Sequence, residues 1–216
     1  MATNVNTFWN FVNYVSNKVQ VGSTLSPSQF NLVANRAQMV LFEKDYETLL
    51  ATEEISEYLR TFLVSNPYMV PANGELAYPS DYQHLASMGN YYNGTFIQCS
   101  EIKNTAWGLE QVSQLRQATK RFSKFTKGGT YIEFLPKNIG IIQMDYFRTP
   151  VAPVWGYTVV SSRPVYDAST STNFEWNETF LNAVAAIFLQ LIGINLREGD
   201  LLQFANQFTA ETNSKL

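Results

Sequence analysis

The first part of the chain places its hydrophobic residues at helical spacing. Over residues 5 to 20 the apolar side chains share one side of a helix that Gly22 ends. A second helix begins at Ser26, which can cap it, because Pro27 suits the first helical position and Gln29 can reach back to the Ser26 N–H. This helix runs to about Tyr46. Two amphipathic helices joined by a short loop predict an αα-hairpin.

Three more helices are expected from the same kind of pattern. A third helix covers residues 53 to 63 and ends before Asn66-Pro67, because the residue before a proline is steered away from helical angles. A modest helix covers residues 105 to 118. Residues 174 to 192 are apolar on more than one face, which is typical of the centre of a bundle. A last amphipathic helix follows at about 201 to 208.

Strict alternation replaces helical spacing in the middle of the chain. Residues 130 to 155 indicate two strands, with one set of alternate residues on the better-buried face: Ile132, Phe134, Ile142, Met144 and Tyr146. Pro136 and Gly140 favour a turn between the strands, and Pro150 ends the second one. We therefore predict that these two strands pair as an antiparallel hairpin.

Other β signals lie on either side of this hairpin. Asn93-Gly94 is a strong sign of a tight turn that would pair residues 82–91 with 95–102, and short strands are expected at 157–160 and 164–166. The predicted fold class is α+β: a helical bundle with an inserted antiparallel β-hairpin or small sheet. We expect a single domain over residues 1–216. Its helical body covers about 5–63 and 174–212, and its β excursion covers about 76–166.

Composition narrows the chemistry more than the fold. Charged residues make up only 15% of the chain, and the formal net charge is −3. Neither value gives a general attraction to nucleic acid or to an anionic membrane. With one cysteine, Cys99, and one histidine, His84, an intrachain disulfide and a cysteine- or histidine-rich metal site are excluded. We expect no cofactor and no bound metal. The first residues, MATNVNTFW, do not indicate a signal peptide.

Candidate catalytic residues are few. His84 follows Asp81 by three residues, so the two form either a local hydrogen bond in a turn or the acid–base pair of a small hydrolase. Neither a GxSxG sequence nor a Cys–His signature accompanies them. Cys99 is predicted to be a small buried thiol in a strand. The sequence therefore favours a protein that is not an enzyme.

One cluster of cations precedes the central strands: Arg116, Lys120, Arg121, Lys124 and Lys127. Such a run is more often a solvated face or a protein interface, and the acidic residues Glu53, Glu54 and Glu57 of an adjacent copy could pair with it. It could also contact nucleic-acid phosphates. A nucleic-acid-binding protein that uses residues 116 to 127 is therefore the alternative function.

Several phrases occur in an order that resembles a known group of proteins. They are YPSDYQHLAS, YIEFLP, IGIIQMDYFRTPVAPVWGY, FEWNE and IGINLRE, within a span from about Phe8 to Phe208. The chain resembles the ring and adaptor proteins of the head–tail connector and tail barrel of crAss-like, short-tailed bacteriophages. Three segments carry most of this resemblance: PSDY, YFRTP at the end of a predicted strand, and GINLRE at the end of the last apolar helix.

This resemblance implies a non-enzymatic virion protein that forms a homo-oligomeric ring of twelve copies. The expected partners are the portal, other ring or tail proteins and the packaged double-stranded DNA that passes through the lumen, with no membrane. The expected location is the virion connector or tail, after assembly in the bacterial host cytoplasm. We expect the 130–148 hairpin to contribute to a subunit or inter-ring contact through a candidate interface set: Tyr131, Tyr146, Phe147, Arg148 and Trp155.

Overall fold

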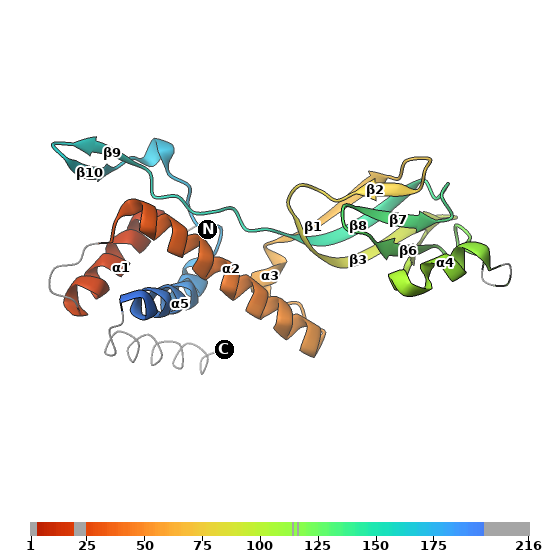
Figure 1. The fold of residues 1–216 in the computed structure, drawn as a ribbon, viewed down its shortest axis with the longest axis horizontal. Helices are drawn as coiled ribbons and strands as arrows, with labels where there is room; N and C mark the ends of the chain where they lie inside the picture. The colour runs from red at the N-terminus through yellow and green to blue at the C-terminus, as the bar shows by residue number, and fades with distance from the viewer. Residues whose placement is uncertain (1–3, 20–24, 114, 116, 197–216) are drawn as a thin grey trace. The chain divides into compact units, whose positions relative to one another are not determined.

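The structure is a computed structural model that describes residues 4–19, 25–113, 115 and 117–196. The chain forms two compact units. One consists of Met1–Thr61 and Pro150–Leu216, and the other of Phe62–Thr149. We call them the helical unit and the sheet unit, and Figure 1 shows the elements of both. The prediction of a single domain over the whole chain stays a prediction.

Aromatic rings form the core of the helical unit. Its helices are α1 (Val5–Val19), α2 (Pro27–Thr52), the short α3 (Glu57–Arg60) and α5 (Glu178–Leu196). The Phe8 ring lies 4.8 Å from the Phe174 ring, 5.7 Å from Phe188 and 5.9 Å from Phe30, measured between centroids. All four side chains are buried. Residues at helical spacing on α1, α2 and α5 thus meet in one core, as amphipathic helices require.

The predicted start of α2 is confirmed, but its end lies further along the chain. Ser26 accepts a hydrogen bond from the Gln29 N–H, and the Gln29 side chain accepts one from the Ser26 N–H, as in a capping box. The helix continues to Thr52, where Glu53 adopts a left-handed conformation with φ 59°. The predicted helix over residues 53–63 is reduced to α3, because the chain enters a strand at Leu63.

The sheet unit contains two four-stranded sheets. One has the order β1 (Leu63–Met69), β8 (Ile141–Arg148), β3 (Tyr82–Tyr92) and β4 (Thr95–Gln98). The other has the order β2 (Glu75–Ala77), β7 (Tyr131–Leu135), β6 (Lys124–Lys127) and β5 (Ser100–Glu101). The β5–β6 pair is parallel, and α4 (Asn104–Val112) makes the crossover between its strands.

The inner faces of the two sheets share one hydrophobic core. Ile132 and Phe134 of β7 meet Ile142, Met144 and Tyr146 of β8 in the same cluster of buried side chains. The alternation in the sequence therefore identified the buried face of each strand correctly. The predicted pairing is wrong, because β7 pairs with β2 and β6, whereas β8 pairs with β1 and β3. Residues 136–140 carry the chain from one sheet to the other.

The predicted helical bundle with one inserted hairpin is therefore wrong, although the α+β class is confirmed. Within the described residues, ten strands form three sheets beside five α-helices. The physical reason is that alternation with period two shows which side of a strand is buried but carries no information about its partner. The predicted amphipathic helix at 201–208 lies outside the residues that the structure describes.

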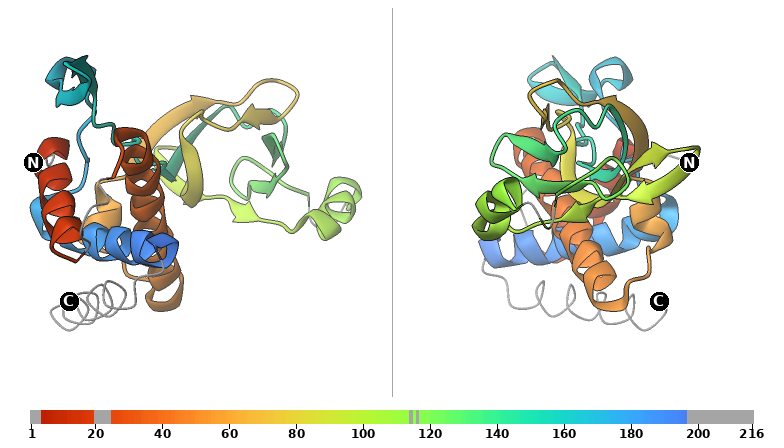
Figure 2. Two further views of the ribbon diagram at one scale, coloured as in Figure 1. Left: turned by 60° about the vertical axis from the view of Figure 1, so that its left-hand side comes forward. Right: turned by 90° about the vertical axis from the view of Figure 1, so that its right-hand side faces the viewer.

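The Asn93-Gly94 hairpin and the two short strands near 157–160 and 164–166 are confirmed, but the hairpin pairs only residues 89–92 with 95–98, because residues 100–101 join the other sheet. Asn93-Gly94 joins β3 to β4, with Tyr92 opposite Thr95. β9 (Tyr157–Val160) and β10 (Arg163–Tyr166) pair as the third sheet, which belongs to the helical unit and is followed by a 3-10 turn over Ala168–Thr170. Figures 1 and 2 show this ribbon clear of α1, α2 and α5.

Candidate interaction surfaces

Stacked aromatic rings hold the base of the β9–β10 hairpin against α1. The rings of Trp155 and Trp9 lie 4.4 Å apart with an interplanar angle of 18°. On the side of the hairpin, Trp155 lies 5.9 Å from Tyr157 and 5.8 Å from Tyr166. Because Tyr157 and Tyr166 are directly opposite each other in the ribbon, both strands are anchored by the same indole ring.

Hydrogen bonds fix the same base. The Trp155 backbone N–H donates to Asn31 Oδ1 of α2 at 2.7 Å, and its indole N–H donates to Asn6 Oδ1 of α1 at 3.0 Å. At the next residue, a Cβ on Gly156 would lie 2.2 Å from Thr170 Oγ1, so only glycine allows this approach. The base of the hairpin is therefore a closely packed joint.

Beyond this joint the hairpin exposes hydrophobic side chains. We call residues 157–166 the arm. The exposed fraction is 67% for Val159, 54% for Val160 and 48% for Val165. A two-stranded ribbon alone is marginally stable in water, so the packed base must compensate for an exposed tip. The register places Val160 and Val165 on one face of the ribbon and Val159 on the other, so both faces of the arm expose apolar side chains.

The sheet unit has a second exposed apolar surface. Met69 of β1 lies opposite Ile141 of β8, and Tyr91 of β3 lies opposite Phe96 of β4. The β3–β8 register, which pairs Asn90 with Ile142, brings these two pairs to one level of the sheet. We call Met69, Ile141, Tyr91 and Phe96 the apolar row. Their exposed fractions range from 41% to 66%, so the row crosses four strands in contact with solvent.

A polar cluster borders the apolar row on the same face. The Asp145 carboxylate of β8 accepts hydrogen bonds from the hydroxyls of Ser65 on β1 and Ser87 on β3, each at 2.5 Å. Gln143 donates to Ser65 Oγ at 2.9 Å. The carboxylate is thus satisfied by neighbouring strands, and this cluster acts within the sheet.

The candidate interface residues of the sequence analysis are mostly internal. Tyr146 and Phe147 are buried in the sheet unit, and Trp155 is buried at the base of the arm. The Arg148 guanidinium lies 5.5 Å from the centroid of the Phe62 ring. Tyr131 is exposed on β7. The contact of this set with another subunit stays a prediction, but its three buried members stabilise the chain's own fold.

Two members of the predicted basic run form ion pairs within the sheet unit. Lys124 pairs with Glu110 of α4, and Lys127 Nζ lies 3.0 Å from Glu101 Oε1 of β5. Lys120 and Arg121 are exposed, and the Arg121 guanidinium lies over the Phe122 ring. Arg116 lies outside the described residues. These ion pairs lower the charge that the run can offer to phosphates.

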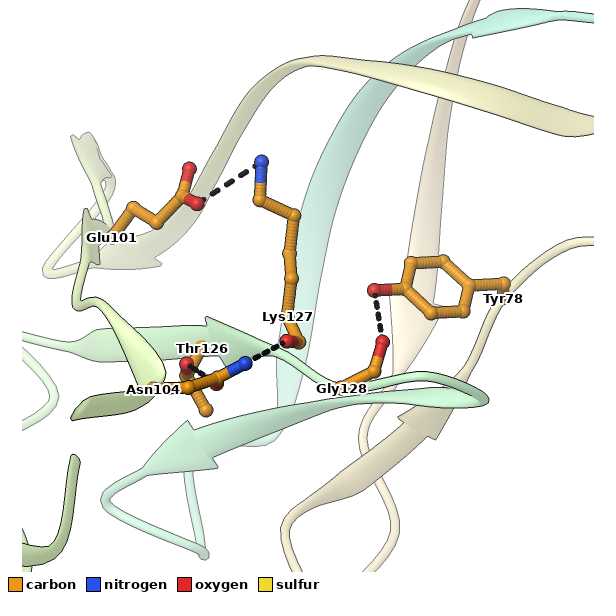
Figure 3. A network of polar contacts seen from close by, with 6 residues as sticks. All are labelled: Tyr78, Glu101, Asn104, Thr126, Lys127 and Gly128. Atoms are coloured by element: carbon orange, nitrogen blue, oxygen red, sulfur yellow. Dashed lines mark hydrogen bonds and ion pairs between the residues drawn. The ribbon is translucent and has the colours of Figure 1, made fainter.

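Figure 3 shows how the Lys127 segment is held. The Lys127 side chain points toward Glu101, and its backbone oxygen accepts from Asn104 Nδ2 at 3.0 Å. Asn104 Oδ1 in turn accepts from the Thr126 hydroxyl at 2.5 Å, and Tyr78 donates to the Gly128 oxygen at 3.1 Å. Burial and the nearby Glu101 charge raise the pKa of Tyr78. The network stabilises the turn from β6 to β7.

The candidate catalytic residues lie in structural positions. His84 is half-buried in β3 opposite Phe147, so it lies in a strand and not in a turn with Asp81. The Asp81 carboxylate accepts from the Tyr146 hydroxyl at 2.9 Å. Cys99 is buried with its sulfur 3.0 Å from Ser123 Oγ, and burial raises the pKa of the thiol. In the described part of the chain, no group of three or more His, Cys, Asp or Glu side chains is placed to hold a metal ion.

No model of a known protein family matches the sequence, and no curated protein matches it either. Among the described residues, none of the helices has the length and apolar character needed to cross a membrane.

Neither the arm nor the apolar row could be identified as a surface from the sequence. It placed strands at 157–160 and 164–166, but YTVV does not alternate, so the exposure of Val159 and Val160 had no signal in the pattern. The apolar row combines residues of four strands, of which β8 is distant along the chain from the other three. Only the register between these strands brings Met69 and Phe96 to one level.

Proposed function

We propose that this chain is a structural virion protein: one subunit of a homo-oligomeric ring, with twelve copies, in the head–tail connector or tail barrel of a short-tailed bacteriophage. In this role the ring forms part of the conduit for genome DNA, with the portal and other ring or tail proteins as neighbours. The chain acts through its shape, and its residues carry out no reaction.

The observation that supports this proposal most directly is the arm. It exposes Val159, Val160 and Val165 at the end of a base that Trp155 holds rigidly. A free monomer gains nothing from exposing these side chains, whereas a subunit of an obligate assembly buries them against its neighbour. The order of sequence phrases that resembles phage ring proteins points to the same class of assembly.

Electrostatics are compatible with a DNA conduit. The formal net charge is −3, and Lys124 and Lys127 of the basic run are paired with Glu110 and Glu101. A strongly cationic lumen would retain DNA, because phosphate contacts dominate non-specific affinity. A weakly charged wall lets the genome pass.

The test is the assembly state of the full chain, alone and together with the portal. Light scattering after size exclusion and negative-stain electron microscopy are expected to show closed rings with twelvefold rotational symmetry. Cryo-electron microscopy of purified virions is expected to place the chain around the tail axis. A chain that remains monomeric with and without the portal, and that is absent from virions, would overturn the proposal.

A further inference from the structure

Six strands lie at the edges of the three sheets in the described part of the chain. An edge strand exposes unpaired N–H and C=O groups, and proteins usually protect it with a charge or a proline. Four of the six carry such protection: Pro67 in β1, Glu75 in β2, Glu101 in β5, and Arg163 with Pro164 in β10. The other two, β4 (TFIQ) and β9 (YTVV), contain neither.

The free edge of the arm lies on β9. Ser161 and Ser162 have φ angles of 49° and 61°, so they form the two-residue turn in which Val160 and Arg163 are a hydrogen-bonded pair. Pairs alternate along an antiparallel ladder, so the backbone groups of the next pair, Val159 and Pro164, point away from the ribbon. Pro164 therefore closes the outer edge of β10, whereas Val159 leaves that of β9 open.

The outer edge of β4 is open in the same way. Asn93 and Gly94 have φ angles of 51° and 78°, so Tyr92 and Thr95 form the hydrogen-bonded pair that closes the turn. The backbone N–H and C=O groups of Phe96, and of Gln98 two residues later, then point outward from the sheet. β4 and β9 are both four residues long.

The side chains beside these two edges are also complementary. On one face of the arm, Tyr157 and Tyr166 are followed by Val159 and Pro164, an uncharged apolar surface. On the sheet unit, the apolar row ends at Phe96 on β4 itself. A strand added beside β4 can continue this row and cover it, which main-chain pairing alone would not achieve.

We propose that β9 of one copy adds to the edge of β4 in a second copy. The sheet β1-β8-β3-β4 of the second copy then continues into β9 and β10 of the first copy. This inference rests on the proposed ring function and identifies one of its contacts. Each copy uses its arm once and its β4 edge once, so the contact is heterologous. Contacts of this kind close into rings when the rotation between copies allows it.

Matched substitutions separate main-chain pairing from side-chain effects. Val159→Pro and Gln98→Pro each remove one outward N–H, and Val159→Thr and Gln98→Thr keep it in a residue that suits strands. Both proline variants are expected to keep the monomer fold, checked by circular dichroism and tryptophan fluorescence. We expect each proline to weaken self-association at least about tenfold in sedimentation velocity, and each threonine to change it less than about threefold.

Cross-linking tests which edges meet. A chain with both Val159→Cys and Gln98→Cys is expected to give a ladder extending beyond dimers when treated with a short bismaleimide. Each single variant, which retains the buried Cys99, is expected to give none. Mixing the two single variants is expected to give dimers. Dimers from Val159→Cys alone would show that two arms pair with each other, and this would overturn the proposal.

The outcomes distinguish this contact from the wider function. If all four matched variants form the same rings as the unmodified chain, the β9–β4 contact is wrong and the ring function stands. If the unmodified chain remains monomeric with the portal and is absent from virions, both proposals fail.

Discussion

The indole rings of Trp9 and Trp155 stack 4.4 Å apart at an angle of 18°, which joins α1 to the segment that leads into the arm. Trp155 also donates hydrogen bonds to the side chains of Asn31 and Asn6. One side chain therefore connects two helices of the helical unit to its exposed ribbon.

Replacing Trp155 with alanine is expected to destabilise the chain by about 3–5 kcal/mol, because the ring is buried and its removal leaves a cavity. Trp155→Phe is the matched control. It keeps an aromatic ring beside Trp9 but loses the N–H that donates to Asn6, so a smaller loss of about 1–2 kcal/mol is expected. Urea unfolding measures both values. An alanine variant as stable as the phenylalanine variant would contradict the role of the stack.

The arm turn is expected to become more stable when it receives glycine. Ser161 and Ser162 both have positive φ angles, which cost a serine roughly 1–2 kcal/mol each relative to more favoured conformations. Ser161→Asn combined with Ser162→Gly supplies the preferred pair for this turn. We expect slower amide hydrogen exchange at Val160 and Arg163. The reverse substitutions, Asn93→Ser with Gly94→Ser, should accelerate amide hydrogen exchange at Thr95. Equal exchange rates before and after both changes would contradict the turn assignment.

A methyl group at Gly89 is expected to disturb β4. The added Cβ would lie 2.4 Å from the Phe96 ring and 2.6 Å from the Ile97 oxygen. We expect Gly89→Ala to cost about 1–3 kcal/mol, since a packed neighbour must move. Gly108→Ala in α4 meets nothing within 4 Å and should stabilise the helix by about 0.5–1 kcal/mol. Thermal unfolding distinguishes the two, and a neutral Gly89→Ala would show that Phe96 does not lie against this position.

Asp45 is expected to make stability depend on pH. Burial raises the pKa of this carboxyl from 3.8 to about 6, an effect that Lys44 partly offsets, and its Oδ2 atom has no hydrogen-bond partner among the described residues. The folded state therefore binds the proton more tightly than the unfolded state. The resulting stabilisation is complete below pH 3.8 and is lost as the pH rises through about 6.

Asp45→Asn tests this sign. At pH 7.5 the variant should be more stable than the unmodified chain by about 1–2 kcal/mol, after allowance for solvent screening of a partly exposed group. The difference should disappear toward pH 4. Urea unfolding across this range measures it, with Glu47→Gln on the exposed side of α2 as the control. A constant difference at every pH would contradict burial as the cause.

Local signals in the sequence were read correctly where the chemistry is local. Ser26 caps α2 and Asn93-Gly94 turns β3 into β4, because each depends on a few neighbouring residues. Strand pairing is not local. Ile132 and Ile142 face the same core from different sheets, and the same alternation would result if their strands were neighbours.

Pro67 shows the same limit in another form. It suits the end of a helix and equally the edge of a sheet, and the structure places it in β1 opposite Gln143. The apolar row depends still more on the register between distant strands. The strand residues of the arm were predicted, but the open edge beside Val159 follows only from the turn geometry at Ser161 and Ser162.

The proline on the outer side of β10 limits how far strands can add to the arm. When another strand pairs with β9, the outer edge of β10 becomes the edge of the enlarged sheet. At Pro164 this edge has no backbone N–H to donate to a further strand. Each docking step thus terminates the sheet it enlarges. Pro164 therefore disfavours the open-ended strand addition that leads to fibrils, to which exposed valine-rich ribbons are prone.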